Sequence, residues 1–239
     1  MRVLAIVHQP DAGAGVFGEV AREAGHELVE WVPTNGGSPE LDGLGAAMVF
    51  GGAMNVDQEG ENPWMRGEKA LLRRLLGERV PVLGVCLGAQ LLAEAAGGAP
   101  RRAARPEIGW VPIELTVEGR ADPVIGPLQE GLEVFEWHSY EAPLPDGAVA
   151  LAHSAVCLQA YRLDGSRAWG VQFHAEVTPI EVNAWLDSYD SDEDAVRIGL
   201  DAEGLRAETL ARLPEWNEVG RGIARRFLTQ AARAPVTRG

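Results

Sequence analysis

The fold is decided by residues 82–90, which read VLGVCLGAQ. The apolar run of a buried strand stops at Cys86, and a helical pattern follows until two glycines end it. Gly84 and Gly88 flank the cysteine, as a tight strand–turn–helix elbow needs, because its backbone leaves no room for side chains. An elbow lifts the sulfur out of the sheet and places it at a helix N-terminus, where free N–H groups favour a thiolate. It therefore predicts a nucleophile at Cys86, although a lone free cysteine is more often a small buried hydrophobe.

Composition bounds the class of protein. The 239 residues are 46% hydrophobic and 23% charged, which is typical of a globular chain. The net charge of −14 argues against nucleic acid or an anionic membrane surface as a partner. Two cysteines, Cys86 and Cys157, cannot form a disulfide framework and indicate a reducing compartment. No apolar run suits a signal peptide or a membrane span, so we expect a cytoplasmic protein.

The first hundred residues alternate between strand and helix patterns. Strands are expected at 3–8, 27–32, 46–50 and 80–85, and helices at 15–24, 63–76 and 90–96. Strands that alternate with helices predict a mainly parallel sheet with helices on both faces.

The second half of the chain has a different texture. Strand-type runs are expected at 111–117, 133–137, 148–152, 157–161 and 168–173, with a hairpin at Asp164-Gly165, so antiparallel strands are added to the sheet. Helices are expected at 180–186, 195–213 and 219–232. The acidic run 190–194 is interpreted as a solvated loop and helix start, and residues 234–239 are expected to be loose.

Two further segments carry candidate chemistry. Residues 170–176 read GVQFHAE, in which Glu176 follows His174 on the same side of an extended chain. The carboxylate can fix the tautomer of the imidazole, so His174 is a candidate general base. Gly51-Gly52 follows a predicted strand and exposes backbone N–H groups, which with that of Leu87 would hold an oxyanion; one such donor is worth about 3–4 kcal/mol. A plain strand-to-helix turn is the alternative for the glycine pair.

Taken together, these segments resemble the class I glutamine amidotransferases. Residues 84–90 match the family's G-x-C-x-G-x-Q elbow, and residues 172–176 match its Q-F-H-P-E motif, with Ala175 where most members carry proline. At Ala175 we expect a slightly looser turn and no loss of activity. Gly51-Gly52-Ala53-Met54 and His138-Ser139 look most like the free-standing, GMP-synthase-like branch. The resemblance implies a flavodoxin-like open α/β sheet, with a catalytic domain over residues 1–178 and a helical extension, residues 179–239, packed on it.

The resemblance also implies roles. Cys86 would attack the glutamine side-chain amide and form a γ-glutamyl thioester. His174 would carry the proton, Glu176 would orient His174, and the N–H groups of Gly52 and Leu87 would hold the oxyanion. The residues implied in substrate binding are Met54, Gln90, Ser139 and Tyr140.

Other polar residues receive plainer interpretations. His138 is expected to be structural or a neighbour of the substrate, and Cys157 a core or surface residue. No cysteine–histidine spacing indicates a metal site, and no cofactor is implied.

Three functions stay open at this point. The chain is a glutaminase that feeds ammonia to a separate synthetase subunit or acts alone, a hydrolase of γ-glutamyl peptides or amines that uses the same triad, or a binding protein that keeps the fold. The tail after Glu176 has no phosphate-binding glycine loop. We therefore expect any acceptor chemistry to lie on another polypeptide.

Overall fold

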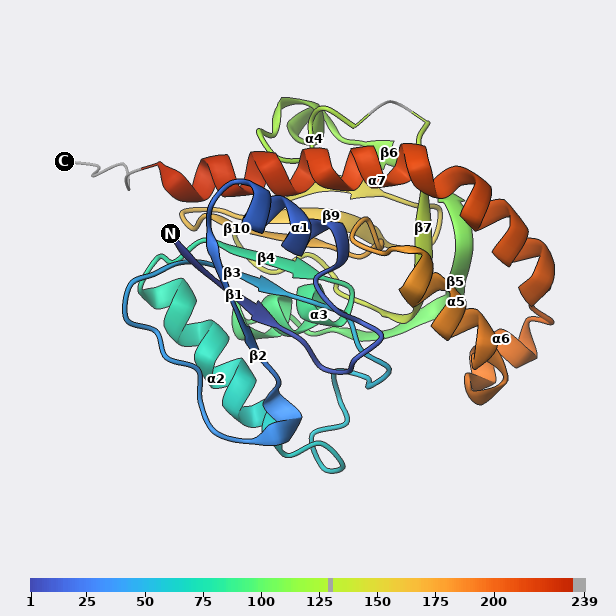
Figure 1. Ribbon diagram of the computed structural model, residues 1–239, viewed down its shortest axis with the longest axis horizontal. Coiled ribbons are helices and arrows are strands. Elements are labelled where there is room, and N and C mark those ends of the chain that lie inside the picture. The colour runs from blue at the N-terminus through green and yellow to red at the C-terminus, as the bar shows by residue number, and fades with distance from the viewer. Residues whose placement is uncertain (129–130, 234–239) are drawn as a thin grey trace.

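The computed structural model describes residues 1–128 and 131–233, and its main feature there is an eight-stranded sheet (Figure 1). Its strand order is β2-β1-β3-β4-β10-β9-β8-β6. The first five strands are parallel, and the last three join them through antiparallel pairs. The order β2-β1-β3-β4 is that of flavodoxin-like sheets. The predicted fold class is confirmed.

The elements have the following bounds. The strands are β1 (Arg2–Ile6), β2 (Glu27–Trp31), β3 (Leu44–Val49), β4 (Val82–Val85), β5 (Arg101–Pro112), β6 (Glu114–Leu115), β7 (Glu133–Glu141), β8 (Ala148–His153), β9 (Leu158–Leu163) and β10 (Ala168–Val171). The helices are α1 (Gly15–Glu23), α2 (Trp64–Gly77), α3 (Leu87–Ala95), α4 (Val117–Ala121), α5 (Pro179–Asp187), α6 (Glu193–Arg197) and α7 (Ala202–Ala232), with short 3₁₀ turns η1 (Pro33–Asn35) and η2 (Tyr189–Ser191).

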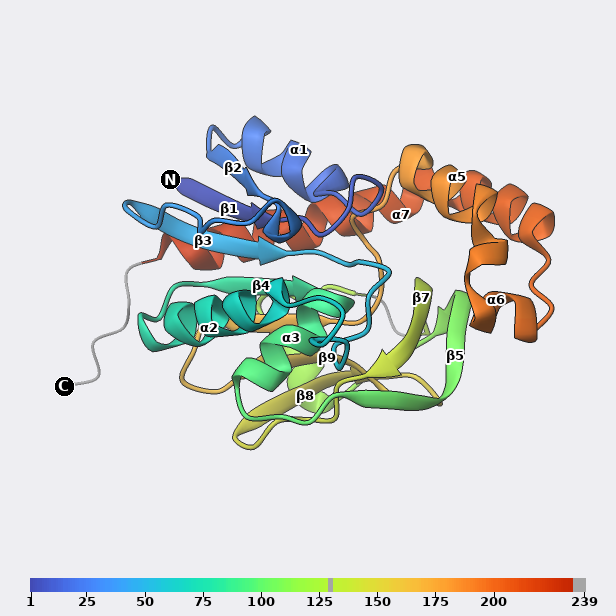
Figure 2. The same ribbon diagram turned by 90° about the horizontal axis from the view of Figure 1, so that it is seen from below.

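Helices cover both faces of the sheet, as Figures 1 and 2 show. α1 and α7 lie on one face, and α2 and α3 on the other. The alternation of β1 fits this arrangement, because Val3 and Ala5 pack into the first layer and Leu4 and Ile6 into the second. β4 is buried along its whole length, as expected of a central parallel strand.

A separate two-stranded ribbon, β5–β7, stands at one end of the sheet beside α5 and α6 (Figure 2). The expectation of one strand over residues 111–117 was wrong: β5 begins at Arg101, β6 is a separate short strand, and α4 begins at Val117. Residues 101–106 read RRAARP and lack apolar alternation. Their strand conformation comes from pairing with β7, in which Arg101 lies opposite Glu141.

The C-terminal helices also differ from the expectation. Residues 195–213 do not form one helix, because α6 ends before Gly199, whose φ of 68° terminates it, and Asp201 caps the start of α7 by accepting from the Gly204 N–H. α7 then continues through Pro214 to Ala232. The buried side chain of Trp216, next to that proline, holds the helix on the core.

The C-terminal segment shares the core of the first half. Ile223 and Phe227 of α7 belong to the same hydrophobic cluster as Phe17 of α1. α5 begins after Thr178, which forms a capping box with Glu181. The domain boundary at residue 178 stays a prediction. The expectation for residues 234–239 lies outside the described residues, and within the described ones no helix combines the length and apolar character needed to cross a membrane.

Candidate active site

Cys86 lies on a strained elbow between β4 and α3. Its backbone has φ 51° and ψ −112°, in the left-handed region that side chains other than glycine rarely adopt. Hydrogen bonds on both sides fix this conformation: the Cys86 N–H donates to the Val171 carbonyl at 2.9 Å, and the Cys86 carbonyl accepts from the Gln90 N–H at 3.0 Å. The thiol is thereby held at the N-terminus of α3.

The two flanking glycines are required by close backbone contact. A Cβ at Gly84 would lie 2.6 Å from the Gly88 carbonyl oxygen, and one at Gly88 would lie 2.1 Å from the Val49 carbonyl oxygen. Both distances are far below van der Waals contact. The elbow therefore packs on itself and on the end of β3, which is the crowding that its sequence predicts.

His174 and Glu176 form a buried pair just after β10. His174 Nδ1 lies 2.8 Å from Glu176 Oε1. The ring stands edge-on to Trp185 at 4.8 Å, and its main chain is fixed by Phe135 of β7 and Trp216 of α7. A carboxylate only accepts, so Nδ1 carries the proton and Nε2 is the nitrogen left for a reaction partner.

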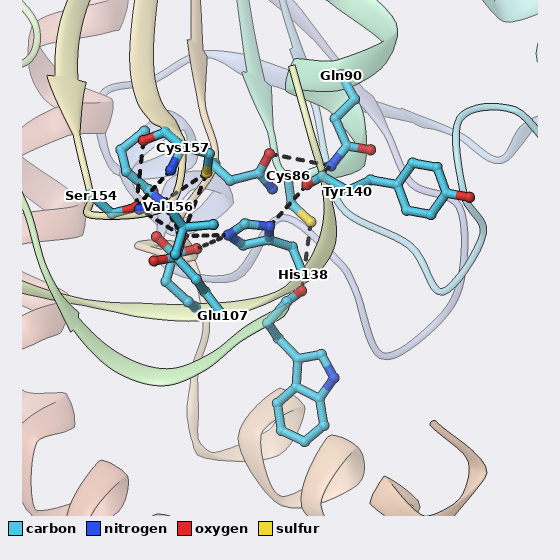
Figure 3. A network of polar contacts seen from close by, with 12 residues as sticks. Cys86, Gln90, Glu107, His138, Tyr140, Ser154, Val156 and Cys157 are labelled. Carbon is cyan, nitrogen blue, oxygen red and sulfur yellow. Dashed lines mark hydrogen bonds and ion pairs between the residues drawn. The ribbon is translucent and has the colours of Figure 1, made fainter. Parts of the chain in front are cut away.

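The electrostatics of His174 favour its charged form. Burial lowers the pKa of His174, but the charges of Glu176 and Cys86, with hydrogen bonds to both, outweigh burial and raise that pKa well above its usual value. Cys86 and His174 line the same cavity, and Gly51 packs against both. In addition, Cys86 Sγ faces the Trp137 carbonyl at 3.9 Å (Figure 3). The structure thus brings the three residues of the predicted triad together.

The predicted oxyanion donors flank the same cavity. Gly52 and Leu87 both line it. Leu87 is the first residue of α3, so its N–H has no acceptor within the helix. The Gly51 carbonyl accepts from His8 Nδ1 at 2.9 Å on the side away from the cavity. His8 is a residue that the sequence reasoning did not single out.

The four residues implied in substrate binding also line the cavity. Gln90 Nε2 donates to the Tyr140 carbonyl at 3.1 Å and to Gln172 Oε1 at 3.2 Å, so α3 is tied to β7 (Figure 3). The Tyr140 hydroxyl donates to Asp57 at 3.0 Å. Met54 lies on the loop after β3, against Gly52. These positions fit the implied roles without testing them.

A buried polar network supports β7 from behind the site. His138 donates from Nδ1 to the Tyr140 carbonyl at 2.9 Å, and its Nε2 lies 3.3 Å from Glu107 and 3.4 Å from Glu136 (Figure 3). Burial, followed by the charge of Glu107, raises the pKa of Glu136 well above its usual value, so Glu136 is a neutral acid at pH 7. The network holds the backbone of residues 138–140 against the cavity.

Glu107, His138 and Cys157 also have the residue types of a metal site, with ligand atoms within 4.8 Å of one another. Glu107 Oε2, however, already accepts from Ser154 at 3.0 Å and from Gln159 at 2.9 Å. Burial and the charge of Glu107 raise the pKa of Cys157, and a thiol that keeps its proton is a poor metal ligand. These contacts make the cluster a hydrogen-bonded support for β7.

The cavity has a volume of about 550 Å³ and is closed on one side by residues 188–194. The described residues that line it include four acidic side chains and one arginine: Asp11, Asp192, Glu193, Asp194 and Arg102. Arg102 pairs with Asp194 through two contacts of 2.6 Å, and Ser139 also donates to Asp194. Burial raises the pKa of Asp194, but these bonds outweigh it and lower that pKa, so the carboxylate stays charged. The expectation that the whole run 190–194 is solvated was therefore wrong for Asp194.

Comparison with known proteins places this geometry in a family. The family model described as glutamine amidotransferase class-I matches residues 14–186. The chain is a class I glutamine amidotransferase family member. The matched range contains the elbow, the glycine pair and the His174–Glu176 pair.

Relatives and solved structures agree with this family. The chain is 32% identical over 224 residues to the glutamine amidotransferase-like protein YfeJ of Salmonella typhimurium, covering 91% of each chain. It is 32% identical over 160 residues to one component of the glutamine-hydrolyzing GMP synthase of Thermoplasma acidophilum, covering 66% of this chain and 76% of that one. A glutamine amidotransferase structure from Thermotoga maritima superposes with a TM-score of 0.85 at 25% identity, covering 98% and 99% of the two chains. One from Methylobacillus flagellatus gives 0.84 at 27% identity, covering 100% and 98%.

Several residues around the family site were not predicted from the sequence. Glu107 pairs with His138 across the β5–β7 ribbon, and Asp194 reaches Arg102 from 92 residues away. No local pattern indicates such contacts. One signal was available: Glu68 lies on the apolar stripe of α2, between buried Met65 and Leu72, where an acid needs a buried partner.

Proposed function

We propose that this family member hydrolyses the side-chain amide of glutamine to glutamate and ammonia through a γ-glutamyl thioester on Cys86. The observation that supports this most is the union, in one cavity, of the positive-φ elbow at Cys86 with the His174–Glu176 pair at 2.8 Å. A strained nucleophile, a positioned base and a residue that orients the base form the constellation of covalent acyl transfer.

The first half of the reaction forms the thioester. His174 takes the thiol proton, and Cys86 Sγ attacks the amide carbon. The charge that develops on the carbonyl oxygen is held by the N–H groups of Gly52 and Leu87. His174 then gives its proton to the leaving nitrogen, and ammonia departs. The raised pKa of His174 keeps this proton available near neutral pH.

The second half releases glutamate. Water enters where ammonia left, and His174 removes a proton from it. The hydroxide attacks the thioester carbon, the same oxyanion donors act again, and the C–S bond breaks. The proton on His174 returns to the sulfur. Glu176 holds the ring in one tautomer throughout, so that Nε2 exchanges the proton in every step.

The test is ammonia release from glutamine by the purified chain. We expect steady release by the wild type and loss of turnover in Cys86→Ser with an unchanged circular dichroism spectrum. We also expect that a reactive glutamine analogue labels Cys86 and blocks release. Full activity of Cys86→Ser would refute the thioester mechanism.

A second candidate is the hydrolysis of γ-glutamyl peptides or γ-glutamyl amines by the same triad. The specific observation in its favour is the cavity of about 550 Å³, within the range of about 300–1,000 Å³ that accommodates ligands much larger than glutamine. Its acidic side chains would suit a leaving group that carries positive charge. Glutamate release from γ-glutamyl amines, with little activity on glutamine, would select this candidate.

Partnership and location follow from the same proposal. Relatives named as components of a GMP synthase are parts of a larger enzyme by that name, and a separate synthetase subunit that receives ammonia is the corresponding proposal here. The two free cysteines agree with the cytoplasmic location that the sequence predicts. If the wild type cleaves neither substrate class and no analogue labels Cys86, a non-catalytic binding role replaces the proposal.

A further inference from the structure

A buried ion pair lies behind the glycine turn, outside the triad. His8 follows β1 and Glu68 is on α2, and both side chains have 0% exposure to solvent. His8 Nε2 lies 3.0 Å from each oxygen of Glu68, and the His8 ring stacks on Trp64 at 5.4 Å. The triad uses neither residue.

Both nitrogens of His8 face groups that accept hydrogen bonds. Nε2 faces the carboxylate of Glu68, and Nδ1 lies 2.9 Å from the Gly51 carbonyl oxygen. A ring with two acceptors has both nitrogens protonated, so His8 is an imidazolium. Burial lowers the pKa of His8, but the charge of Glu68 and hydrogen bonds to Glu68 and Gly51 outweigh burial and raise it.

The contact with Gly51 fixes the orientation of a whole peptide unit. The Gly51 carbonyl and the Gly52 N–H belong to the same trans peptide plane, in which the C=O and the N–H point in opposite directions. With the carbonyl held on His8, the Gly52 N–H points away from His8. A Cβ on Gly51 would lie 3.0 Å from His174 Cε1 and 3.7 Å from Cys86 Cβ, so the triad is on the other side of the turn.

The neighbouring peptides are tied to the same segment after β1. The Phe50 N–H donates to the Ile6 carbonyl at 3.0 Å, and the Ala53 N–H donates to Gln9 Oε1 at 2.7 Å. Gln9 is in turn held by Asp11 at 2.7 Å. Residues 6–11 therefore hold residues 50–53 along their length, with His8 on the central peptide.

We propose that His8, held by Glu68, is a positioning residue that turns the Gly51–Gly52 peptide so that its N–H faces Cys86, and that the oxyanion hole is thereby formed in this chain without a partner. This inference rests on the proposed function for the chemistry that the N–H serves. Its geometric claim, the direction of the peptide, does not depend on that chemistry.

The test uses two double variants that differ in one donor. His8→Phe with Glu68→Leu replaces the ion pair by apolar groups, so no charge is left buried, and such replacements often keep or raise stability. His8→Asn with Glu68→Leu is its match, because the Asn side-chain amide places a donor near the position of Nδ1. The single variant His8→Phe is avoided, since it leaves the Glu68 carboxylate buried without a partner.

We expect the Phe variant to unfold at nearly the same temperature as the wild type but to lose about 100-fold in kcat, because one oxyanion donor is worth about 10²–10³ in kcat. KM should change less than threefold, since Gln90, Ser139 and Tyr140 are untouched. The Asn variant should recover at least tenfold in kcat. A Phe variant with full kcat, or two variants with equal kcat, would overturn the inference.

Two further results separate this inference from the proposed function. Crystal structures of the wild type and the Phe variant should show the Gly51 carbonyl on His8 in the first and reoriented in the second; an unchanged peptide would overturn the inference even if no γ-glutamyl substrate were cleaved. If no substrate is cleaved and Cys86 is unlabelled, only the proposed function fails. Ammonia release that begins only when a synthetase is added would contradict an oxyanion hole formed by His8.

Discussion

Replacing Glu176 by glutamine tests how the buried carboxylate controls His174. The change removes the charge 2.8 Å from Nδ1 and keeps the size of the side chain. If the amide presents its NH₂ to Nδ1, the ring must carry its proton on Nε2, where it cannot accept one from Cys86. If the amide presents its oxygen, the NH₂ takes the place of Glu176 Oε2, which has no hydrogen-bond partner.

Both outcomes have a calculable effect. Leaving a buried NH₂ unpaired costs about 1–3 kcal/mol, and a lost charge-assisted hydrogen bond about 1.5–3 kcal/mol. At 1.4 kcal/mol per factor of ten, these give a loss of about 10–10² in rate, and in the serine protease template the wrong tautomer lowers kcat by about 10⁴. We therefore expect kcat of Glu176→Gln to fall by about 10²–10⁴, with KM changed only a few-fold.

The matched control is Glu136→Gln. Glu136 is a second buried glutamate whose charge would act on His174, but it is neutral because its pKa is raised. Replacing a neutral acid by a neutral amide should change kcat less than threefold. The assay is ammonia release from glutamine followed between pH 5 and 10. If Glu176→Gln keeps more than half of kcat, or if both variants lose activity equally, the reasoning fails.

The pH profile gives an independent check with a defined sign. The pKa of His174 is raised, mainly against the opposing effect of burial, by Glu176 and then by Cys86. Activity that needs the imidazolium is lost as pH rises through that raised pKa, so the alkaline limb of Glu176→Gln should begin at lower pH than that of the wild type. The stabilisation from the pair is likewise complete below the unfolded pKa of about 6.5 and lost as pH rises through the folded one.

Two further predictions concern stability and thiol chemistry. Gly88→Ala should destabilise the chain by at least about 1–3 kcal/mol in urea unfolding, because its Cβ would lie 2.1 Å from the Val49 carbonyl oxygen, whereas Gly67→Ala in α2, with open space around it, should stabilise by about 0.5–1 kcal/mol; equal effects would contradict the crowded elbow. Cys157→Ala should keep kcat within threefold, and mass spectrometry after mild alkylation near pH 8 should find Cys157 unmodified because its pKa is raised; modification of Cys157 would refute that environment.

The sequence predicts the parts of the fold that follow local patterns. The apolar run before Cys86 indicates a central parallel strand, and Gly84 and Gly88 indicate the elbow, because crowding on each side excludes a Cβ. The strand into His174 and the spacing to Glu176 predict a pair that the structure brings to 2.8 Å. These features are encoded within seven to nine residues, so pattern reasoning finds them.

Features that depend on distant partners were missed. β5 starts at Arg101 because β7 pairs with it, not because its own residues alternate. His8 and Glu68 are 60 residues apart, and each reads as part of an ordinary strand or helix. Asp194 belongs to an acidic run that is typical of a solvated loop, yet it is buried against Arg102. Only the folded chain brings these charges together.

The most direct test of the thioester on Cys86 is mass spectrometry of the chain quenched with acid during turnover of glutamine. The account predicts one γ-glutamyl group, located on the peptide that contains Cys86, which is absent from Cys86→Ala and accumulates when the second half of the reaction is slowed. Turnover at the wild-type rate by Cys86→Ala, or turnover of the wild type with no adduct on Cys86 at any time, would contradict it.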